Sequence, residues 1–185
     1  MRRCPFGFPA AVETLPADAS GTPFPTLFYA TCPTLVAAVG ALESRGAVRR
    51  FERRLRDEPA LARSLVAATR AARRRRRDLA AAFDLRFVDD GASLRTGIGG
   101  VLDTRTLKCL HAHAAHALAH PGYLLGAAVL NEAGPLWCED GRCSAFEDAA
   151  SSGVASRAAS STAPARRGRS CGGMSSRRFR RVTAE

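Results

Sequence analysis

The sequence predicts a small α+β domain that is mostly helical, with a short extended or β portion and a disordered C-terminal tail. Three observations predict this class. Apolar residues recur at helical spacing in segments that start at capping residues and stop at glycine or proline. β-branched and aromatic residues are confined to short stretches bounded by turn residues. The chain of 185 residues is 46% hydrophobic, enough for one core, but its last part lacks large apolar side chains.

That last part sets the division of the chain. From about residue 147, serine, alanine, glycine and arginine predominate. Such a segment cannot bury enough apolar surface to offset the entropy of ordering it. We therefore expect a single α+β domain with a Cys/His cluster over residues 1–146 and a disordered tail over residues 147–185.

The N-terminal part is typical of extended chain followed by a helix. The stretch "TLFYA" (26–30) predicts a short strand within residues 24–30. Thr31 and Pro33 predict a helix start, through a capping hydroxyl and a proline in the first turn, and Gly46 is placed to end the helix. The expected apolar stripe of this helix consists of Leu35, Ala38, Val39 and Leu42.

A longer helix is expected from Pro59 to about Phe83, with Asp57 as its cap. Its apolar stripe consists of Leu61, Leu65, Ala68, Ala72 and Leu79. The run Arg73–Arg77 falls inside this helix, and we interpret it as a solvated helical face.

The next segment, "LRFVDDGASL", predicts a strand, a turn and a returning strand, which extends the β portion to residues 85–101. The glycine cluster "GIGG" (97–100) follows. Asp103 or Thr104 is then expected to cap a helix that runs through the histidine-rich segment and ends before a Pro-Gly pair.

The net charge of +11 comes almost entirely from arginine. It favours nonspecific polyanion contacts by the Arg-rich tail, although genomic base composition alone can produce such richness. No apolar run approaches the roughly 20 residues of a membrane span, and the start lacks the apolar centre of a signal peptide. We therefore expect a cytoplasmic protein without membrane association, whose cysteines are thiols or metal ligands rather than disulfides.

The stretch "TLKCLHAHAAHALAH" (106–120) contains the chain's only lysine and all four histidines. On a helix, one band of about 60° holds a cysteine and three histidines: Cys109, His113, His116 and His120. Residues one turn apart can share a metal ion, but the ends of this band lie too far apart for one ion. The other ligands must come from elsewhere, and His120 is interpreted as a capping or surface group.

Cys4 and Cys32, each beside a proline, are the candidates. The predicted metal ligands are three sequence-distant cysteines and one histidine: Cys4, Cys32, Cys109 and one of His111, His113 and His116. Such a set suits zinc or an iron–sulfur cluster. We favour a structural role for the metal, because no carboxylate is placed as a clear general base.

A thiol-dependent enzyme with Cys109 as nucleophile is the first alternative. The helix dipole and Lys108 would lower the pKa of this thiol, and a histidine such as His111 would be the base. Backbone N–H groups of the "GIGG" loop could cradle an oxyanion or a phosphate. Candidate cofactor-binding residues are therefore Gly97, Gly99 and Gly100, although a turn that needs positive φ explains them equally well.

Three cysteines remain outside these hypotheses. Cys138 and Cys143, in "WCEDGRC", resemble half of a zinc knuckle without its second half, and we interpret the pair as incidental. Cys171 lies in the tail and is expected to be a free thiol.

Four segments of the sequence, taken in this order, resemble the pattern of one family: "RRCPFGFP" (2–9), "PFPTLFYATCPTLVAAVGALESRG" (23–46), "GIGG" (97–100) and "KCLHAHAAHALA" (108–119). The chain is similar to the bacterial domain of unknown function 501 family over roughly residues 2–131. This resemblance points to Cys4, Cys32, Cys109, His111 and His116, with Lys108 beside them. It implies no established activity. Some relatives carry a septum-formation label, so a noncatalytic division-associated interaction protein is the second alternative.

Overall fold

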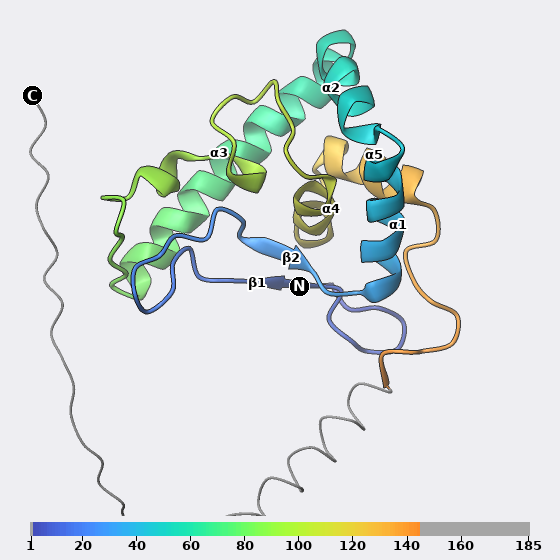
Figure 1. The fold of residues 1–185 in the computed structure, drawn as a ribbon, viewed down its shortest axis with the longest axis horizontal. Helices are drawn as coiled ribbons and strands as arrows, with labels where there is room; N and C mark the ends of the chain where they lie inside the picture. The colour runs from blue at the N-terminus through green and yellow to red at the C-terminus, as the bar shows by residue number, and fades with distance from the viewer. Residues whose placement is uncertain (1, 145–185) are drawn as a thin grey trace, which may run out of the picture. The chain divides into compact units, whose positions relative to one another are not determined.

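The computed structural model describes residues 2–144. In this part the chain forms five α-helices, a two-stranded antiparallel sheet and two short 3-10 helices (Figure 1). The elements are β1 (Ala11–Glu13), β2 (Phe28–Ala30), α1 (Pro33–Ser44), α2 (Ala47–Asp57), α3 (Pro59–Ala82), η1 (Ala92–Arg95), η2 (Ile98–Gly100), α4 (Leu110–Ala119) and α5 (Leu124–Ala133). The predicted α+β class, mostly helical, is confirmed. The predicted tail, with Cys171, lies outside the described residues.

The sheet joins the N-terminal segment to the chain just before α1. Strands β1 and β2 run antiparallel, with Ala11 opposite Ala30. The N–H group of Thr31 donates to the carbonyl oxygen of Ala10 at 3.0 Å, which extends the pairing up to the helix start. Strand β2 confirms the prediction for residues 24–30, and the proline-rich segment supplies its partner.

Helix α1 begins at Pro33 and is followed by Gly46 at φ +75°, as the sequence predicts. The expected cap is wrong. Cys32 is the N-cap residue, because the Thr31 hydroxyl donates instead to the carbonyl oxygen of Pro9 at 2.6 Å. Thr31 therefore ties the N-terminal segment to the helix start.

Helix α2 was not predicted, because most of its residues are charged. Only Ala47, Phe51 and Leu55, spaced one turn apart, are buried in it. Helix α3 agrees with the predicted helix, although Glu58 rather than Asp57 is its N-cap residue. The whole predicted stripe of α3 is buried: Leu61, Leu65, Ala68, Ala72 and Leu79.

The interpretation of the arginine run as a solvated face is wrong at one position. Arg76 is 1% exposed. Its guanidinium group donates to the carbonyl oxygens of Thr96 (2.5 Å), Gly97 (3.1 Å) and Pro25. Burial, and then the charge of Arg73, lowers the pKa of Arg76 to about 10. Arg76 thus fastens two loops onto α3.

The strands expected within residues 85–101 are also wrong. This segment forms turns and the two 3-10 helices η1 and η2. The Asp89 carboxylate accepts from the N–H groups of Gly91 (3.1 Å) and Ser93 (2.7 Å), which turns the chain back on itself. Because Arg76 binds the carbonyl oxygens of Thr96 and Gly97, these groups are not available for a sheet ladder.

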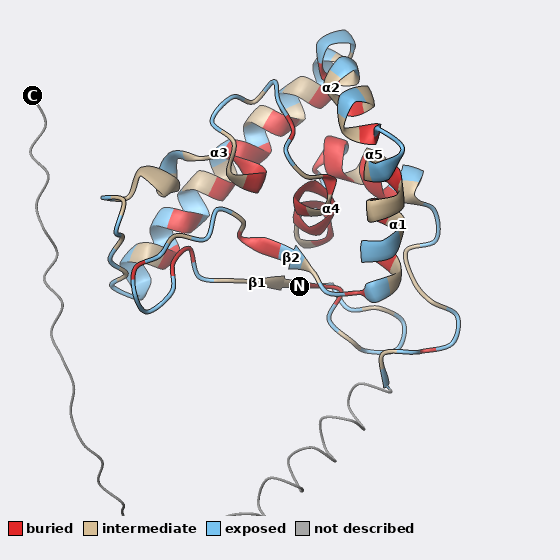
Figure 2. Ribbon diagram, in the orientation of Figure 1, coloured by how far each residue is buried: buried red, intermediate tan, exposed pale blue. Residues whose placement is uncertain are grey.

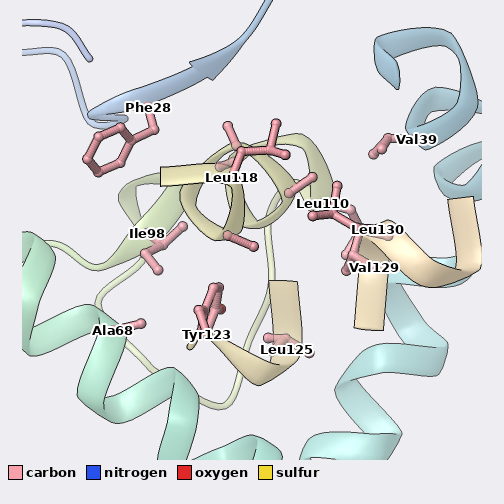
Figure 3. Packing of buried hydrophobic residues seen from close by; sticks show 14 of the residues in the cluster. Phe28, Val39, Ala68, Ile98, Leu110, Leu118, Tyr123, Leu125, Val129 and Leu130 are labelled. Carbon is pink, nitrogen blue, oxygen red and sulfur yellow. The ribbon is translucent and has the colours of Figure 1, made fainter. Parts of the chain in front are cut away.

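Helix α4 lies at the centre of the fold and is buried almost throughout (Figures 1 and 2). It packs against α5, β2, α1 and η2. Figure 3 shows Leu110 and Leu118 of α4 among Phe28 of β2, Ile98 of η2 and Val129 of α5. None of the helices within residues 2–144 is both long and apolar enough to cross a membrane.

Candidate functional site

Three potential metal ligands from α1 and the start of α4 come together. Glu43 lies in the last turn of α1, Cys109 is the N-cap residue of α4, and His111 is in its first turn. A carboxylate oxygen, the thiol sulfur and a ring nitrogen all lie within 4.8 Å of one another. We call this set the Glu43–Cys109–His111 cluster.

The separations within the cluster fit a small tetrahedral ion. Nδ1 of His111 lies 3.3 Å from Oε2 of Glu43 and 3.7 Å from Sγ of Cys109. Ligands bound tetrahedrally to zinc at its usual bond lengths are about 3.3–3.8 Å apart. The side chains of Glu43 and His111 are 26% and 27% exposed, so the cluster is partly open to solvent.

One hydrogen bond fixes the tautomer of His111. Its Nε2 atom lies 3.0 Å from the carbonyl oxygen of Val36 on α1. A carbonyl oxygen can only accept, so Nε2 carries a hydrogen and donates it. In the neutral ring, Nδ1 then presents its lone pair to Glu43 and Cys109. This is the arrangement of metal-binding histidines, whose other nitrogen donates to a carbonyl or a carboxylate.

The Cys109 thiol does not have the lowered pKa that we expected. Burial raises its pKa, and the charge of Glu43 raises it further. The expectation failed because it considered the helix dipole and Lys108 but not the burial of the thiol or the neighbouring carboxylate. Lys108 itself is exposed.

Helix α4 begins at Leu110, later than the predicted start near Asp103 or Thr104. Two carboxylates hold the chain that enters it. Oε1 of Glu43 accepts from the N–H group of Leu110 at 2.5 Å, and Oε1 of Glu52 accepts from that of Leu107 at 3.0 Å. Cys109 therefore lies before the helix, so the helical band that grouped it with His113, His116 and His120 does not apply to it.

The other histidines lie in or beside the core. His113 is fully buried, and its Nδ1 forms a 2.6 Å hydrogen bond with the Tyr123 hydroxyl. The His116 ring lies edge-on to Phe28 and to Tyr123, with both centroid distances 5.3 Å. His120 is the C-cap residue and is exposed. Within residues 2–144, no group of three ligand atoms within 4.8 Å joins Cys109 to His113 or His116.

Burial keeps the rings of both core histidines, His113 and His116, unprotonated near pH 7. It lowers the pKa of His113 to about 4. It lowers the pKa of His116 to about 3, with further lowering by the charges of His120, His113 and Arg76. Both rings are therefore neutral near pH 7, and their role in this structure is packing.

A comparison with protein families identifies the chain. Residues 1–131 match the family described as "Protein of unknown function (DUF501)". The chain belongs to this family. Neither a curated protein nor a solved structure matches the chain. The matched residues of the DUF501 domain include the whole Glu43–Cys109–His111 cluster and end before Cys138 and Cys143.

The DUF501 domain does not bring Cys4 and Cys32 to Cys109 as one ligand set. Within residues 2–144, no group of three ligand atoms within 4.8 Å contains Cys4 or Cys32 with Cys109. Cys32 precedes α1, whereas Cys109 lies beside Glu43, eleven positions later and roughly 16 Å along the helix axis. The Sγ atom of Cys32 instead lies 3.9 Å from the carbonyl oxygen of Leu136.

The glycine cluster of the DUF501 domain has a packing role. The N–H groups of Gly97 and Gly100 donate to the carbonyl oxygens of Val101 and Gly97, so they are not available to a phosphate. A Cβ atom on Gly100 would lie 2.7 Å from Cβ of Pro25, and Gly100 has φ +78°. Gly99 is buried beside Ala112 of α4. The loop needs glycine for close packing.

Sequence reasoning missed Glu43 as a member of the site. Its signal was present in "ALESRG", where a carboxylate in the last turn of a helix is disfavoured by the helix dipole. A favourable contact must therefore offset the unfavourable interaction of this carboxylate with the helix dipole. In the DUF501 domain the carboxylate makes this contact with the N–H group of Leu110 and the ring of His111.

Proposed function

We propose that the DUF501 domain is a metal-binding domain in which Glu43, Cys109 and His111 hold one divalent transition-metal ion, with zinc the best fit. The observation that carries the proposal is the convergence of three different donor atoms within 4.8 Å. Zinc accepts thiolate, imidazole and carboxylate ligands together, whereas magnesium and calcium prefer oxygen alone.

The charges of the cluster support a cation. Without one, Glu43 and an ionised Cys109 repel each other, which is part of why the pKa of the thiol is raised. A bound divalent ion removes this repulsion and displaces the thiol proton. Binding therefore releases a proton, and the affinity for the ion rises with pH.

Three protein ligands leave a fourth tetrahedral position for water or another ligand. Sites of this kind are typical of catalytic zinc, whereas structural zinc has four protein ligands. An ion held by the cluster would have access to solvent, because Glu43 and His111 are each about a quarter exposed. The proposal thus favours an exchangeable coordination position on the ion over a purely structural role.

The thiol-dependent enzyme is the second candidate, because His111 lies 3.7 Å from the Cys109 sulfur. Two observations weigh against it. In a catalytic triad the acid and the nucleophile contact different ring nitrogens, but Glu43 and Cys109 both face Nδ1 of His111. The raised pKa of the thiol also disfavours the thiolate at neutral pH.

Alkylation of Cys109, followed peptide by peptide in a mass spectrometer, separates the two candidates. For a metal site, stoichiometric zinc slows labelling of Cys109 in the full chain, and His111→Ala abolishes this protection. His120→Ala, the same change at an exposed histidine, keeps the protection. Rapid labelling of the metal-free protein at neutral pH, unaffected by zinc, would establish the nucleophile and refute the metal site.

Cytoplasmic location is part of the proposal, because both candidates require Cys109 as a free thiol and a reducing compartment maintains one. The structure contains Cys109 unpaired.

A further inference from the structure

We propose that Cys4, Cys32, Cys138 and Cys143 form a second metal site, in which four thiolates hold a structural zinc ion. This site shares no residue with the Glu43–Cys109–His111 cluster and does not depend on it. It would join the N-terminal turn, the start of α1 and the segment that follows α5.

Three contacts bring the segment after α5 against the N-terminal part of the chain. The guanidinium carbon of Arg2 lies 5.5 Å from the centroid of the Trp137 ring. The Phe6 ring covers Gly141 so closely that a Cβ atom there would lie 3.0 Å from it. The third contact is the 3.9 Å approach of the Cys32 thiol to the carbonyl oxygen of Leu136.

In each contact, both of the contacting residues either are a cysteine or lie within two positions of one. Cys4 lies midway between Arg2 and Phe6, and Cys138 and Cys143 follow Trp137 and Gly141. The contacts therefore converge on the four cysteines from four positions in the sequence. Incidental cysteines would not be expected at every one of these places.

Local backbone structure presents the thiols from tight turns. The N–H group of Gly7, at φ +86°, donates to the carbonyl oxygen of Cys4 at 3.0 Å, and that of Cys4 donates to Phe8 at 2.9 Å. On the other side, Ser144 donates to the carbonyl oxygen of Gly141, which has φ +59°. Turns of this kind, with a glycine at positive φ, can hold two thiols of a set on opposite sides of an ion.

The charges near these thiols fit the same site. A zinc ion with four thiolates keeps a net charge of about −2. Arg3 donates to the carbonyl oxygen of Gly7, and Arg2 lies over the Trp137 ring, so cationic side chains are present in the turn that carries Cys4.

Binding requires the thiols to turn toward one point. Within residues 2–144, the only side chains with three ligand atoms all within 4.8 Å are those of the Glu43–Cys109–His111 cluster. The proposed site requires the partly exposed Cys4, Cys138 and Cys143 to rotate their side chains until their sulfurs lie about 2.3 Å from an ion beside Cys32. The cation–π contact and the Phe6 packing hold the two segments together for this step.

Zinc content of the full chain, purified without oxygen, tests the site. Cys138→Ser with Cys143→Ser should lose one zinc equivalent relative to the wild type. Cys171→Ser, the same change at a cysteine outside the proposed set, should lose none. His111→Ala should lose a different equivalent, so the two proposals fail separately. Equal zinc in the double variant and the wild type would refute the second site.

Labelling of the wild-type protein keeps the test decisive if the double variant does not fold. With zinc bound, Cys4, Cys138 and Cys143 should resist alkylation together, and a chelator should expose all three together, while Cys171 labels in both states. A Cys138–Cys143 disulfide in this material, or the visible absorption of an iron–sulfur cluster, would overturn the zinc site. Independent labelling of the three thiols would overturn a shared ion of any kind.

Discussion

Nε2 of His111 donates a 3.0 Å hydrogen bond to the carbonyl oxygen of Val36, seven residues before Glu43 on the same helix. Helix α1 thus supplies both the group that sets the tautomer of His111 and the carboxylate that faces its other nitrogen. Gly40 lies between them, and a Cβ atom there would already touch the His111 ring at 3.9 Å. The His111 ring therefore lies within van der Waals reach of α1 at this position.

Glu43→Gln should weaken zinc binding at this cluster by at least about tenfold, because it removes a ligand charge. The amide oxygen can still accept from the N–H group of Leu110, so the start of α4 is retained. Glu52→Gln is the matched control, since Glu52 makes the equivalent bond to Leu107 and is not in the cluster. Competition with a zinc chelator measures both affinities. Equal losses in the two variants would assign Glu43 a structural role alone.

Arg76→Met should lower the free energy of unfolding by about 3 kcal/mol or more. The substitution leaves buried carbonyl oxygens of Pro25 and Gly97 without their donor. Arg74→Met, two positions away on the exposed face of α3, should change it by no more than about 0.5 kcal/mol. Urea denaturation of the two variants in parallel gives both values, and similar values would contradict the burial of Arg76.

Gly126→Ala should destabilise the protein strongly, by about 3 kcal/mol or more. Helices α4 and α5 approach so closely there that a Cβ atom would lie 2.4 Å from the carbonyl oxygen of His113 and 2.6 Å from Cβ of Ala117. Gly122→Ala places the same methyl group where nothing lies within 4 Å and should be nearly neutral. Thermal unfolding compares the two. A stable Gly126→Ala variant would rule out this packing of the two helices.

Stability should fall as the pH drops from about 6.5 toward 4. The unfolded chain protonates its histidines near 6.5, whereas folded His113 and His116 stay neutral down to pKa values of about 4 and 3. The unfolded state therefore binds more protons in this window, and each histidine changes the unfolding equilibrium about tenfold per pH unit. The stabilising contribution is complete above about 6.5.

His116→Phe isolates one of these contributions. The new ring can occupy the place between Phe28 and Tyr123 without titrating. The free energy of unfolding of this variant, from urea denaturation, should depend less on pH than that of the wild type. Between pH 6 and 4 the variant should take up about one proton fewer on unfolding. An unchanged slope would mean that His116 is protonated in the folded protein.

The parts of the fold predicted correctly are those with local signals. Pro33 and Gly46 mark the ends of α1, and the spacing of Leu61, Leu65 and Leu79 gives the buried face of α3. Helix α2 was missed because arginines outnumber its apolar residues. Its few buried side chains depend on tertiary packing, in which α2 lies against α1 and α3. The sequence predicts Arg76 to be a surface residue, because the carbonyl groups that it binds lie 20 or more positions away and leave no local signal.

The candidate site was predicted in part. Cys109 and His111 were chosen from sequence, and they do lie together. Their partner Glu43 was missed, because the contact depends on how α1 packs beside α4 and no local pattern encodes it. Cys4 and Cys32 were assigned to the same set as Cys109, but within residues 2–144 no group of three ligand atoms within 4.8 Å contains either of them with Cys109. Division-associated interaction remains a prediction from resemblance.

Cadmium NMR of the full chain tests whether Glu43, Cys109 and His111 hold a metal ion. The chemical shift of bound cadmium depends on how many thiolates hold it, so a one-thiolate site and a four-thiolate site give separate resonances. We predict a resonance typical of one thiolate with nitrogen and oxygen ligands, which His111→Ala removes and His120→Ala preserves. Its absence from the wild-type spectrum, or its survival in the His111→Ala variant, would contradict the Glu43–Cys109–His111 site.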